Sequence, residues 1–113
     1  MTTTNPSDLL PLRPVVFGIL TVLRRSPLHG YGIMQLANDH VGHRALLGPG
    51  TLYRTLKELR AGGMIEHAAT PGGTDARRQY YRLTQFGADV AVAEAQRLGR
   101  LIDTGALASQ RAG

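Results

Sequence analysis

The sequence predicts a mainly α-helical fold that carries one small β-hairpin and ends in a further helix. Three observations lead to this prediction: three helical apolar patterns separated by glycine and proline breaks, strand-like alternation after residue 63, and helical spacing again after Thr84. The 113 residues are the usual size of one domain. We expect a tail over 1–10, a domain over 11–83, a final helix within 84–108 and a second tail over 109–113.

The first two helices are predicted by the spacing of apolar residues. After Pro14, which is tolerated at an early helical position, apolar residues recur at helical spacing over residues 15–25. Residues 26–30 contain serine, proline and glycine and should break this helix. Apolar spacing then resumes at Tyr31, which predicts a second helix ending near residues 38–42.

The third helix is predicted over residues 51–60 and is amphipathic. Leu52, Leu56 and Leu59 lie on one of its faces. The other face should be polar and net positive, with Thr51, Arg54, Thr55, Lys57 and Glu58. The paired glycines at 62–63 should end the helix, because glycine readily adopts the left-handed conformation found at helix C-termini.

Two strand-like segments, 64–69 and 77–83, flank a glycine-containing stretch over 70–76 and predict a β-hairpin. Alternation along the second strand would separate its side chains onto two faces. One face would hold Gln79, Tyr81 and Leu83, and the opposite face Arg78, Tyr80 and Arg82.

The last helix should begin after Thr84, which is a good N-cap residue, and continue to about Leu107. Once the preceding elements have closed on themselves, we expect no core for this helix to join. Its apolar positions would then need a second copy of the chain, and a two-fold homodimer is the commonest solution. The candidate dimerisation residues are Val90, Leu98, Leu101 and Ile102. The alternative is that this helix folds back against the first helix of its own chain.

Composition excludes several classes of protein. The chain is 42% hydrophobic and 19% charged, and it has no apolar run of the ~18 residues that a membrane span requires. It contains no cysteine, so it has no disulfide and no thiolate metal site. Its N-terminus lacks the features of a secretory signal. We therefore expect a cytoplasmic protein that makes no membrane contact.

The positive charge is concentrated in the middle of the chain. The net charge is +5, and residues 44–82 carry seven basic and three acidic residues, whereas residues 83–113 carry three of each. An arginine-rich composition imposed by a GC-rich coding sequence would raise the isoelectric point, but it would not cluster the charge. The clustering predicts a polyanionic partner.

Three helices followed by a hairpin form the plan of a winged helix-turn-helix, in which the third helix enters the DNA major groove and the hairpin reaches the flanking backbone or minor groove. The candidate residues for binding double-stranded DNA are Thr51, Tyr53, Arg54, Lys57, Arg77 and Arg78. An ordinary solvated surface helix remains the alternative for the third helix. For Arg82 the alternative is an ion pair within the hairpin.

Catalysis and metal binding are not expected. The chain has no nucleophile elbow, no Walker loop and no paired-carboxylate arrangement. Asp39, His40 and His43 are of metal-ligating types, but His29 and His67 are placed elsewhere and cysteine is absent, so a closed four-ligand site is hard to assemble. We expect a protein that is not an enzyme and that carries no metal or cofactor.

Several motifs, taken together and in order, resemble the PadR family of bacterial transcriptional regulators. The match extends from about Val15 to Gly87. Its most specific segments are Leu28-His29-Gly30-Tyr31-Gly32-Ile33, Gly50-Thr51-Leu52-Tyr53 and Arg78-Gln79-Tyr80-Tyr81-Arg82-Leu83-Thr84.

The resemblance implies a dimeric winged-helix repressor that a small-molecule effector releases from DNA. The single helix after Thr84 is similar to the compact branch of the family, in which that helix dimerises and the effector binds at the dimer interface. Drug-binding members carry a tryptophan in that helix, and this chain has none. The leading hypothesis is therefore a regulator that binds a pseudo-palindromic operator as a homodimer. The alternative is a winged-helix protein-interaction module without sequence-specific DNA binding.

Overall fold

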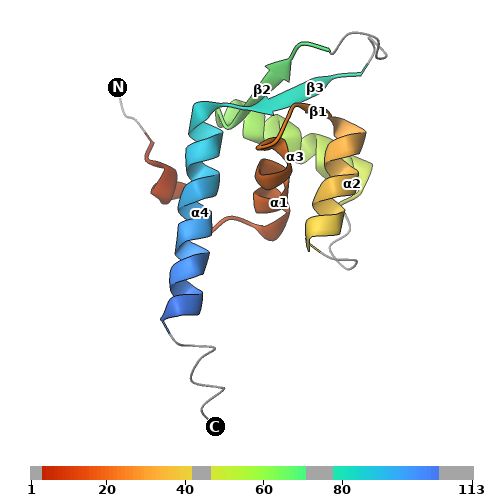
Figure 1. The fold of residues 1–113 in the computed structure, drawn as a ribbon. Helices are drawn as coiled ribbons and strands as arrows, with labels where there is room; N and C mark the ends of the chain where they lie inside the picture. Colours follow the sequence, from red (N-terminus) through yellow and green to blue (C-terminus); the bar gives the residue numbers. More distant parts are fainter. Residues whose placement is uncertain (1–3, 42–46, 71–77, 105–113) are drawn as a thin grey trace.

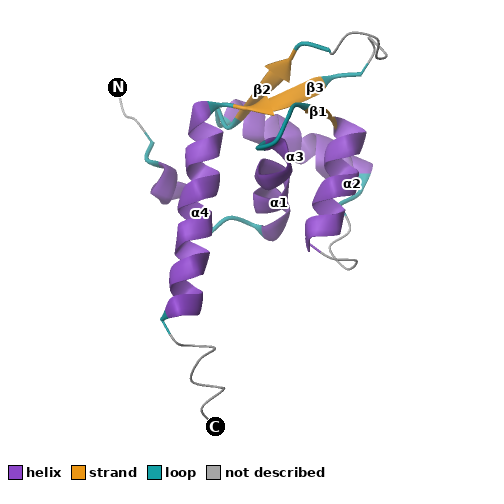
Figure 2. Ribbon diagram, in the orientation of Figure 1, coloured by secondary structure: helices purple, strands orange, loops and turns teal. Residues whose placement is uncertain are grey.

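The computed structural model describes residues 4–41, 47–70 and 78–104. Within these ranges the elements are the 3-10 helix η1 (Pro6–Leu9), helices α1 (Pro14–Leu23), α2 (Gly30–Val41), α3 (Pro49–Ala61) and α4 (Gln85–Asp103), and strands β1 (Leu28–His29), β2 (Ile65–Ala68) and β3 (Tyr80–Leu83). Helix α1 lies between α4 and α2, and the sheet crosses one end of the helices (Figures 1 and 2). The predicted fold class, mainly α-helical with a small β-hairpin in a winged helix-turn-helix, is confirmed.

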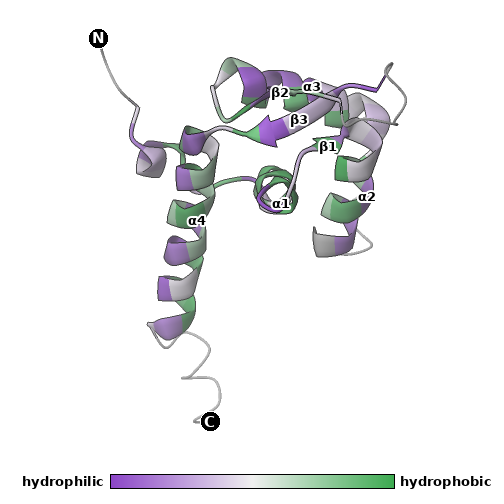
Figure 3. Ribbon diagram, turned by 45° about the horizontal axis from the view of Figure 1, so that its top comes forward, coloured by the Kyte–Doolittle hydropathy of each residue, from purple (hydrophilic) through white to green (hydrophobic). Residues whose placement is uncertain are grey.

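Helix α1 is the centre of the core. Its residues Ile19 and Leu20 are fully buried, and α2 and α4 both pack against it. Figure 3 shows α1 as an almost continuously hydrophobic helix between its two neighbours. The predicted helix over 15–25 is thus confirmed in position, although α1 ends at Leu23.

The sheet has three strands in the order β1-β3-β2, all antiparallel. The hairpin of β2 and β3 was predicted, with longer strands than those observed. Strand β1 was not predicted, because its two residues are too few to show alternation. It pairs with β3 through Leu28 opposite Tyr81 and His29 opposite Tyr80, and so attaches the start of α2 to the sheet.

The predicted alternation along β3 agrees with its pairing, in which Tyr81 faces His67 and Arg82 faces Glu66, but neither face of the strand is left open. Tyr80 and Tyr81 are adjacent in the chain, yet both are buried, with 8% and 7% of their surface exposed. The Tyr80 ring packs edge-on against His29 at a centroid distance of 5.4 Å, and the Tyr81 ring lies 5.1 Å from His67. As the central strand, β3 has a neighbour on each side, and each tyrosine packs against a ring of a neighbouring strand.

Helix α3 buries Leu52, Leu56 and Leu59, as predicted. Thr55 was expected on its polar face but is only 2% exposed, because it follows Leu52 by three residues and shares the leucine face. The helix ends as expected from its glycines. Gly63 has φ +77°, and the Met64 N–H donates to the Leu59 carbonyl oxygen at 2.9 Å, which is the hydrogen bond of a Schellman motif.

The N-terminal segment differs from the predicted tail. Residues Pro6–Leu9 form η1, which packs against α4 (Figure 1). Beyond η1, the Leu12 N–H donates to Glu94 Oε2 of α4 at 2.7 Å. Glu94 is only 2% exposed, and Arg97 binds the same carboxylate through Nε at 2.5 Å and Nη2 at 3.2 Å. A buried, fully paired carboxylate therefore fixes this segment to α4.

Helix α4 joins the core of its own chain over its first half, contrary to the prediction that it has no core to join. Val90 and Ala91 are 0% and 2% exposed and belong to the same apolar cluster as α1. The alternative, packing against the first helix, is correct for this half of α4. Among the described residues, no helix is both long and apolar enough to cross a membrane.

Candidate nucleic-acid interface

One face of α3 is exposed, polar and positively charged. Thr51, Arg54 and Lys57 follow one another at intervals of three residues, and all are exposed opposite the buried leucines. The acidic Glu58 on this helix pairs with Arg13 at 3.2 Å. Arg54 and Lys57 form no ion pair within the part of the chain that the structure describes. The outward charge of α3 is therefore positive.

Tyr53 connects α3 to the start of α2. It is 56% exposed, and its ring lies over Gly30, where an added Cβ would be 3.0 Å from the tyrosine hydroxyl oxygen and 3.1 Å from a ring carbon. Only a residue without a side chain allows so close an approach without a shift of the ring. Tyr53 thus lies between the exposed face of α3 and the first turn of α2.

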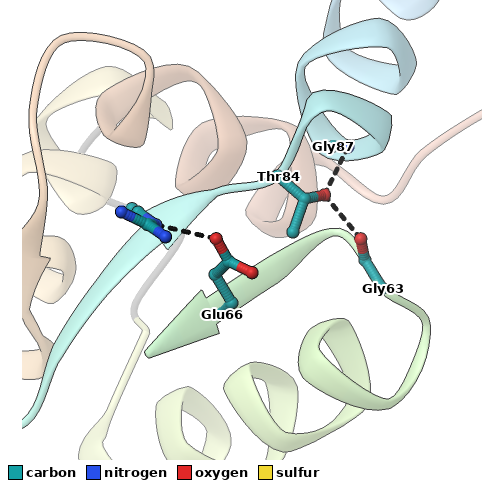
Figure 4. Close-up of polar contacts among 5 residues, drawn as sticks. Gly63, Glu66, Thr84 and Gly87 are labelled. Carbon is teal, nitrogen blue, oxygen red and sulfur yellow. Dashed lines mark hydrogen bonds and ion pairs between the residues drawn. The ribbon is translucent and has the colours of Figure 1, made fainter. Parts of the chain in front are cut away.

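The two described arginines of the hairpin have different environments. Arg82 Nε donates to Glu66 Oε2 at 2.7 Å across the β2–β3 pair, so the alternative of an ion pair within the hairpin is correct for Arg82 (Figure 4). Arg78 is exposed, and its Nη1 lies 2.8 Å from Nε2 of His29. Arg77, the other predicted hairpin contact, lies outside the described residues.

His29 is a residue that sequence reasoning missed. Its Nδ1 accepts a hydrogen bond from the Gly32 N–H at 3.1 Å, so its side chain caps the N-terminus of α2. Burial lowers the pKa of His29, and the nearby positive charge of Arg78 lowers it further. Its position directly before the first residue of α2 was the available signal, although histidine is not among the preferred capping residues.

His29, Tyr31, Tyr53 and Arg78 meet at one pocket of about 260 Å³. These side chains come from β1, α2, α3 and the segment just before β3 respectively, so the pocket lies where the predicted recognition helix approaches the hairpin. Tyr31 is 55% exposed, and its hydroxyl accepts a hydrogen bond from Gln35 at 3.1 Å. The structure thus places hydrogen-bonding side chains from α2, α3 and the hairpin side by side.

Thr84 fixes the hairpin relative to α4. Its hydroxyl donates to the Gly63 carbonyl oxygen at 2.5 Å and accepts from the Gly87 N–H at 3.0 Å (Figure 4). The predicted N-cap is therefore confirmed. Through this residue the end of β3, the turn after α3 and the first turn of α4 are joined, so the hairpin has a fixed position beside α3.

The predicted dimerisation residues divide into two groups. Val90 is fully buried in the core of its own chain, so assigning it to a dimer contact was wrong. Leu98 is half-buried, whereas Leu101 and Ile102 are 51% and 57% exposed. Leu101 follows Val90 by about three helical turns and lies on the same side of α4. The apolar face that begins in the core thus continues beyond it, where α4 projects past the other elements (Figure 1).

Within the described residues, no three metal-ligating side chains come together. The suggested group of Asp39, His40 and His43 includes the His40 side chain and the whole of His43, both of which lie outside the described part.

Comparison with known proteins identifies the family of this chain. Residues 19–93 match the family described as "Transcriptional regulator PadR-like family". A curated relative is 35% identical over 83 residues, an uncharacterised protein of transposon TN4556 from Streptomyces fradiae. The match covers 74% of this chain but only 22% of that relative's length.

Solved structures with similar folds include three regulators. A PadR family regulator from Clostridium difficile has a TM-score of 0.70 at 22% identity, with 89% of this chain and 100% of that chain covered. A PadR-like regulator from Bacillus cereus has a TM-score of 0.68 at 23% identity, covering 86% and 91%. Bacillus subtilis PadR, solved in complex with operator DNA, has a TM-score of 0.56 at 28% identity, covering 81% of this chain and 48% of that one.

These likenesses agree with the motif resemblance and with the expectation that the chain is not an enzyme. The chain belongs to the PadR-like family of transcriptional regulators.

Proposed function

We propose that this chain binds double-stranded DNA by inserting α3 into the major groove. The observation that carries the proposal is the exposed polar face of α3, in which Thr51, Arg54 and Lys57 project together opposite a buried leucine face. The threonine hydroxyl and the arginine guanidinium suit base edges, and the lysine ammonium suits a phosphate. The operator complex of B. subtilis PadR, a protein of the same family, supports this proposal.

The hairpin would contact the DNA backbone beside α3. Arg78 is exposed on the same side as Tyr53, and the pocket between them brings the hairpin next to the recognition helix. Arg77 directly precedes Arg78, and we assign it the same role from the sequence. A planar guanidinium suits a phosphate or a narrow minor groove, because its fork of donors is permanently charged. Arg82 is not included, since Glu66 pairs with it.

A homodimer through the end of α4 would present two such interfaces. Leu101 and Ile102 are exposed and Leu98 is only half-buried, so the described residues of the same chain leave this apolar side of α4 incompletely covered over the final turns. A second copy related by a two-fold axis would bury this face and place two α3 helices about 34 Å apart, which is one turn of DNA. The operator would then be pseudo-palindromic.

The proposed function includes repression of transcription and its relief by a small molecule. Occupying an operator would repress transcription in the cytoplasm, and a small molecule bound at the dimer interface would release the protein by changing the distance between the two α3 helices. The motif resemblance supports both steps. Because the tryptophan of the drug-binding members is absent, an aliphatic contact surface formed by Leu98, Leu101 and Ile102 would face such an effector.

A hydroxyl-radical footprint tests the proposal. The full chain would be bound to a duplex from the region upstream of its own gene, with a shuffled duplex of equal length as the control. We expect two protected windows on the upstream duplex, separated by about 34 Å, and none on the shuffled duplex. Uniform cleavage of both duplexes at saturating protein would contradict sequence-specific binding and would favour the protein-interaction module.

A further inference from the structure

His29 faces hydrogen-bond donors at both of its ring nitrogens. The Gly32 N–H donates to Nδ1 at 3.1 Å, and Nη1 of the Arg78 guanidinium lies 2.8 Å from Nε2. A neutral imidazole has one nitrogen with a lone pair, and its other nitrogen carries a proton. Arginine stays protonated and has no acceptor atom. His29 can therefore accept a hydrogen bond from only one of these two donors.

The fixed donor decides which nitrogen keeps its lone pair. The Gly32 N–H belongs to the first turn of α2, where the helix itself offers no acceptor, so it depends on His29. The Arg78 side chain is exposed and can turn. Burial and the Arg78 charge also lower the pKa of His29, which favours the neutral ring. Nε2 then carries the proton, and two donors face each other across 2.8 Å.

Two facing donors form a site for a shared acceptor. They open into the pocket of about 260 Å³ that Tyr31 and Tyr53 also line. No carboxylate from the described residues lines this pocket, so an anionic acceptor has to come from another molecule. An anion with several oxygens would accept from both groups at once. Tyr53 belongs to α3, which places the site at the edge of the proposed major-groove contact.

We propose that His29 and Arg78 together bind one phosphate of the DNA backbone, with His29 donating from Nε2–H and Arg78 from its guanidinium. The inference rests on the proposed function, because the phosphate is supplied by the duplex that α3 reads. Binding the phosphate keeps Nδ1 as the cap of α2 and gives both facing donors an acceptor. Because a phosphate carries no sequence information, the contact should increase the affinity of the protein for all duplexes alike.

The variant His29→Asn separates the cap from the phosphate contact. The asparagine side-chain oxygen can accept the Gly32 N–H, since asparagine is among the best capping residues, but no atom reaches the position of Nε2. We expect only a small decrease in thermal stability, from the lost edge-on contact with the Tyr80 ring, and about fivefold weaker binding to both the upstream and the shuffled duplex. Arg78→Gln should also weaken binding to both duplexes. The matched control Arg82→Gln should not, because Glu66 already pairs with Arg82.

The tautomer provides a second, independent readout. Nitrogen-15 NMR of the His29 ring at about pH 7.5, above the usual histidine pKa of about 6.5, reports which nitrogen carries the proton. We expect protonated Nε2 with and without DNA, and slower exchange of that proton in the complex. Wild-type affinity of His29→Asn, or a proton on Nδ1 in the complex, would overturn the phosphate site alone. Failure of the wild-type chain to bind any duplex would overturn the proposed function as well.

Discussion

Gly87 of α4 lies directly against the backbone of Met64, so that a Cβ added to Gly87 would be 2.0 Å from the Met64 carbonyl oxygen. The same carbonyl oxygen accepts a hydrogen bond from the Thr84 N–H at 3.1 Å. The first turn of α4 therefore contacts the turn that follows α3, and it does so at a position that only glycine can occupy. This contact sets where the hairpin lies relative to the recognition helix.

Replacing Gly87 with alanine should destabilise the protein by about 2 kcal/mol or more, because the methyl group meets backbone that cannot turn away. Urea unfolding would measure the change. Gly99→Ala is the matched control in the same helix, since nothing lies within 4 Å of its added Cβ. That variant should be more stable by about 0.5–1 kcal/mol. Equal effects of the two substitutions would contradict the close packing of α4 on Met64.

Glu94 predicts a pH dependence of stability. Its hydrogen bonds to Arg97 and Leu12 lower its pKa from 4.5, and they outweigh the opposing effect of burial. Because the pKa is lower in the folded state than in the unfolded state, the pair contributes stability above pH 4.5 that is lost as the pH falls through the folded-state pKa. Glu94→Gln should reduce stability by about 1–3 kcal/mol at neutral pH.

Unfolding of both proteins between neutral and acidic pH checks this prediction. The difference between wild type and Glu94→Gln should shrink as the pH falls below 4.5. Asp89→Asn is the matched control, an exposed carboxylate on the same helix that accepts only from Gln85 among the described residues. A constant difference at every pH would show that the charge on Glu94 does not contribute to stability.

The end of α4 should control oligomeric state. Leu101→Arg or Ile102→Arg puts a charge into the proposed dimer interface, so we expect a monomer by light scattering. Val92→Arg is the control, because Val92 is also exposed but lies about half a turn of helix away from Leu101. A wild-type monomer, or a dimer that persists in both arginine variants, would contradict assembly through this face.

Two alanine variants should distinguish a contact that reads bases from a contact with the DNA backbone. Arg54→Ala should reduce discrimination between the upstream and the shuffled duplex, because it removes a donor from base edges. Arg78→Ala should weaken binding to both duplexes alike, and it should make the slope of log affinity against log salt shallower by about 0.9. Fluorescence anisotropy with both duplexes across salt concentrations measures these effects. Equal losses on the two duplexes for Arg54→Ala would remove its base-reading role.

The helices were predictable because their leucines and valines recur at helical spacing, and the Thr84 cap because threonine suits that position. The burial of Thr55 was also implicit in the leucine spacing, but its hydroxyl suggested a polar face. Other features depend on contacts between distant residues, such as the pairing of His29 with Tyr80 and of Leu12 with Glu94. Local pattern carries no signal for such contacts.

The candidate site was also predictable only where a local pattern marked it. The exposed face with Arg54 and Lys57 followed from the amphipathic pattern of α3, and its exposure is as predicted. The contact between His29 and Arg78 joins residues 49 positions apart in the chain, so the sequence did not bring them together. Val90 was misassigned because an apolar residue on a terminal helix looks the same whether its own core or a partner covers it.

Binding to DNA across a range of salt concentrations is the decisive test of whether this chain recognises a specific DNA sequence. The full chain would be titrated into a labelled duplex from its own upstream region and into a shuffled duplex. We expect tight binding with clear preference for the upstream duplex, and a log–log salt slope of about −0.9 for each phosphate contacted. Weak binding of equal strength to the two duplexes would contradict sequence-specific recognition and would reduce the basic face of α3 to a non-specific electrostatic surface.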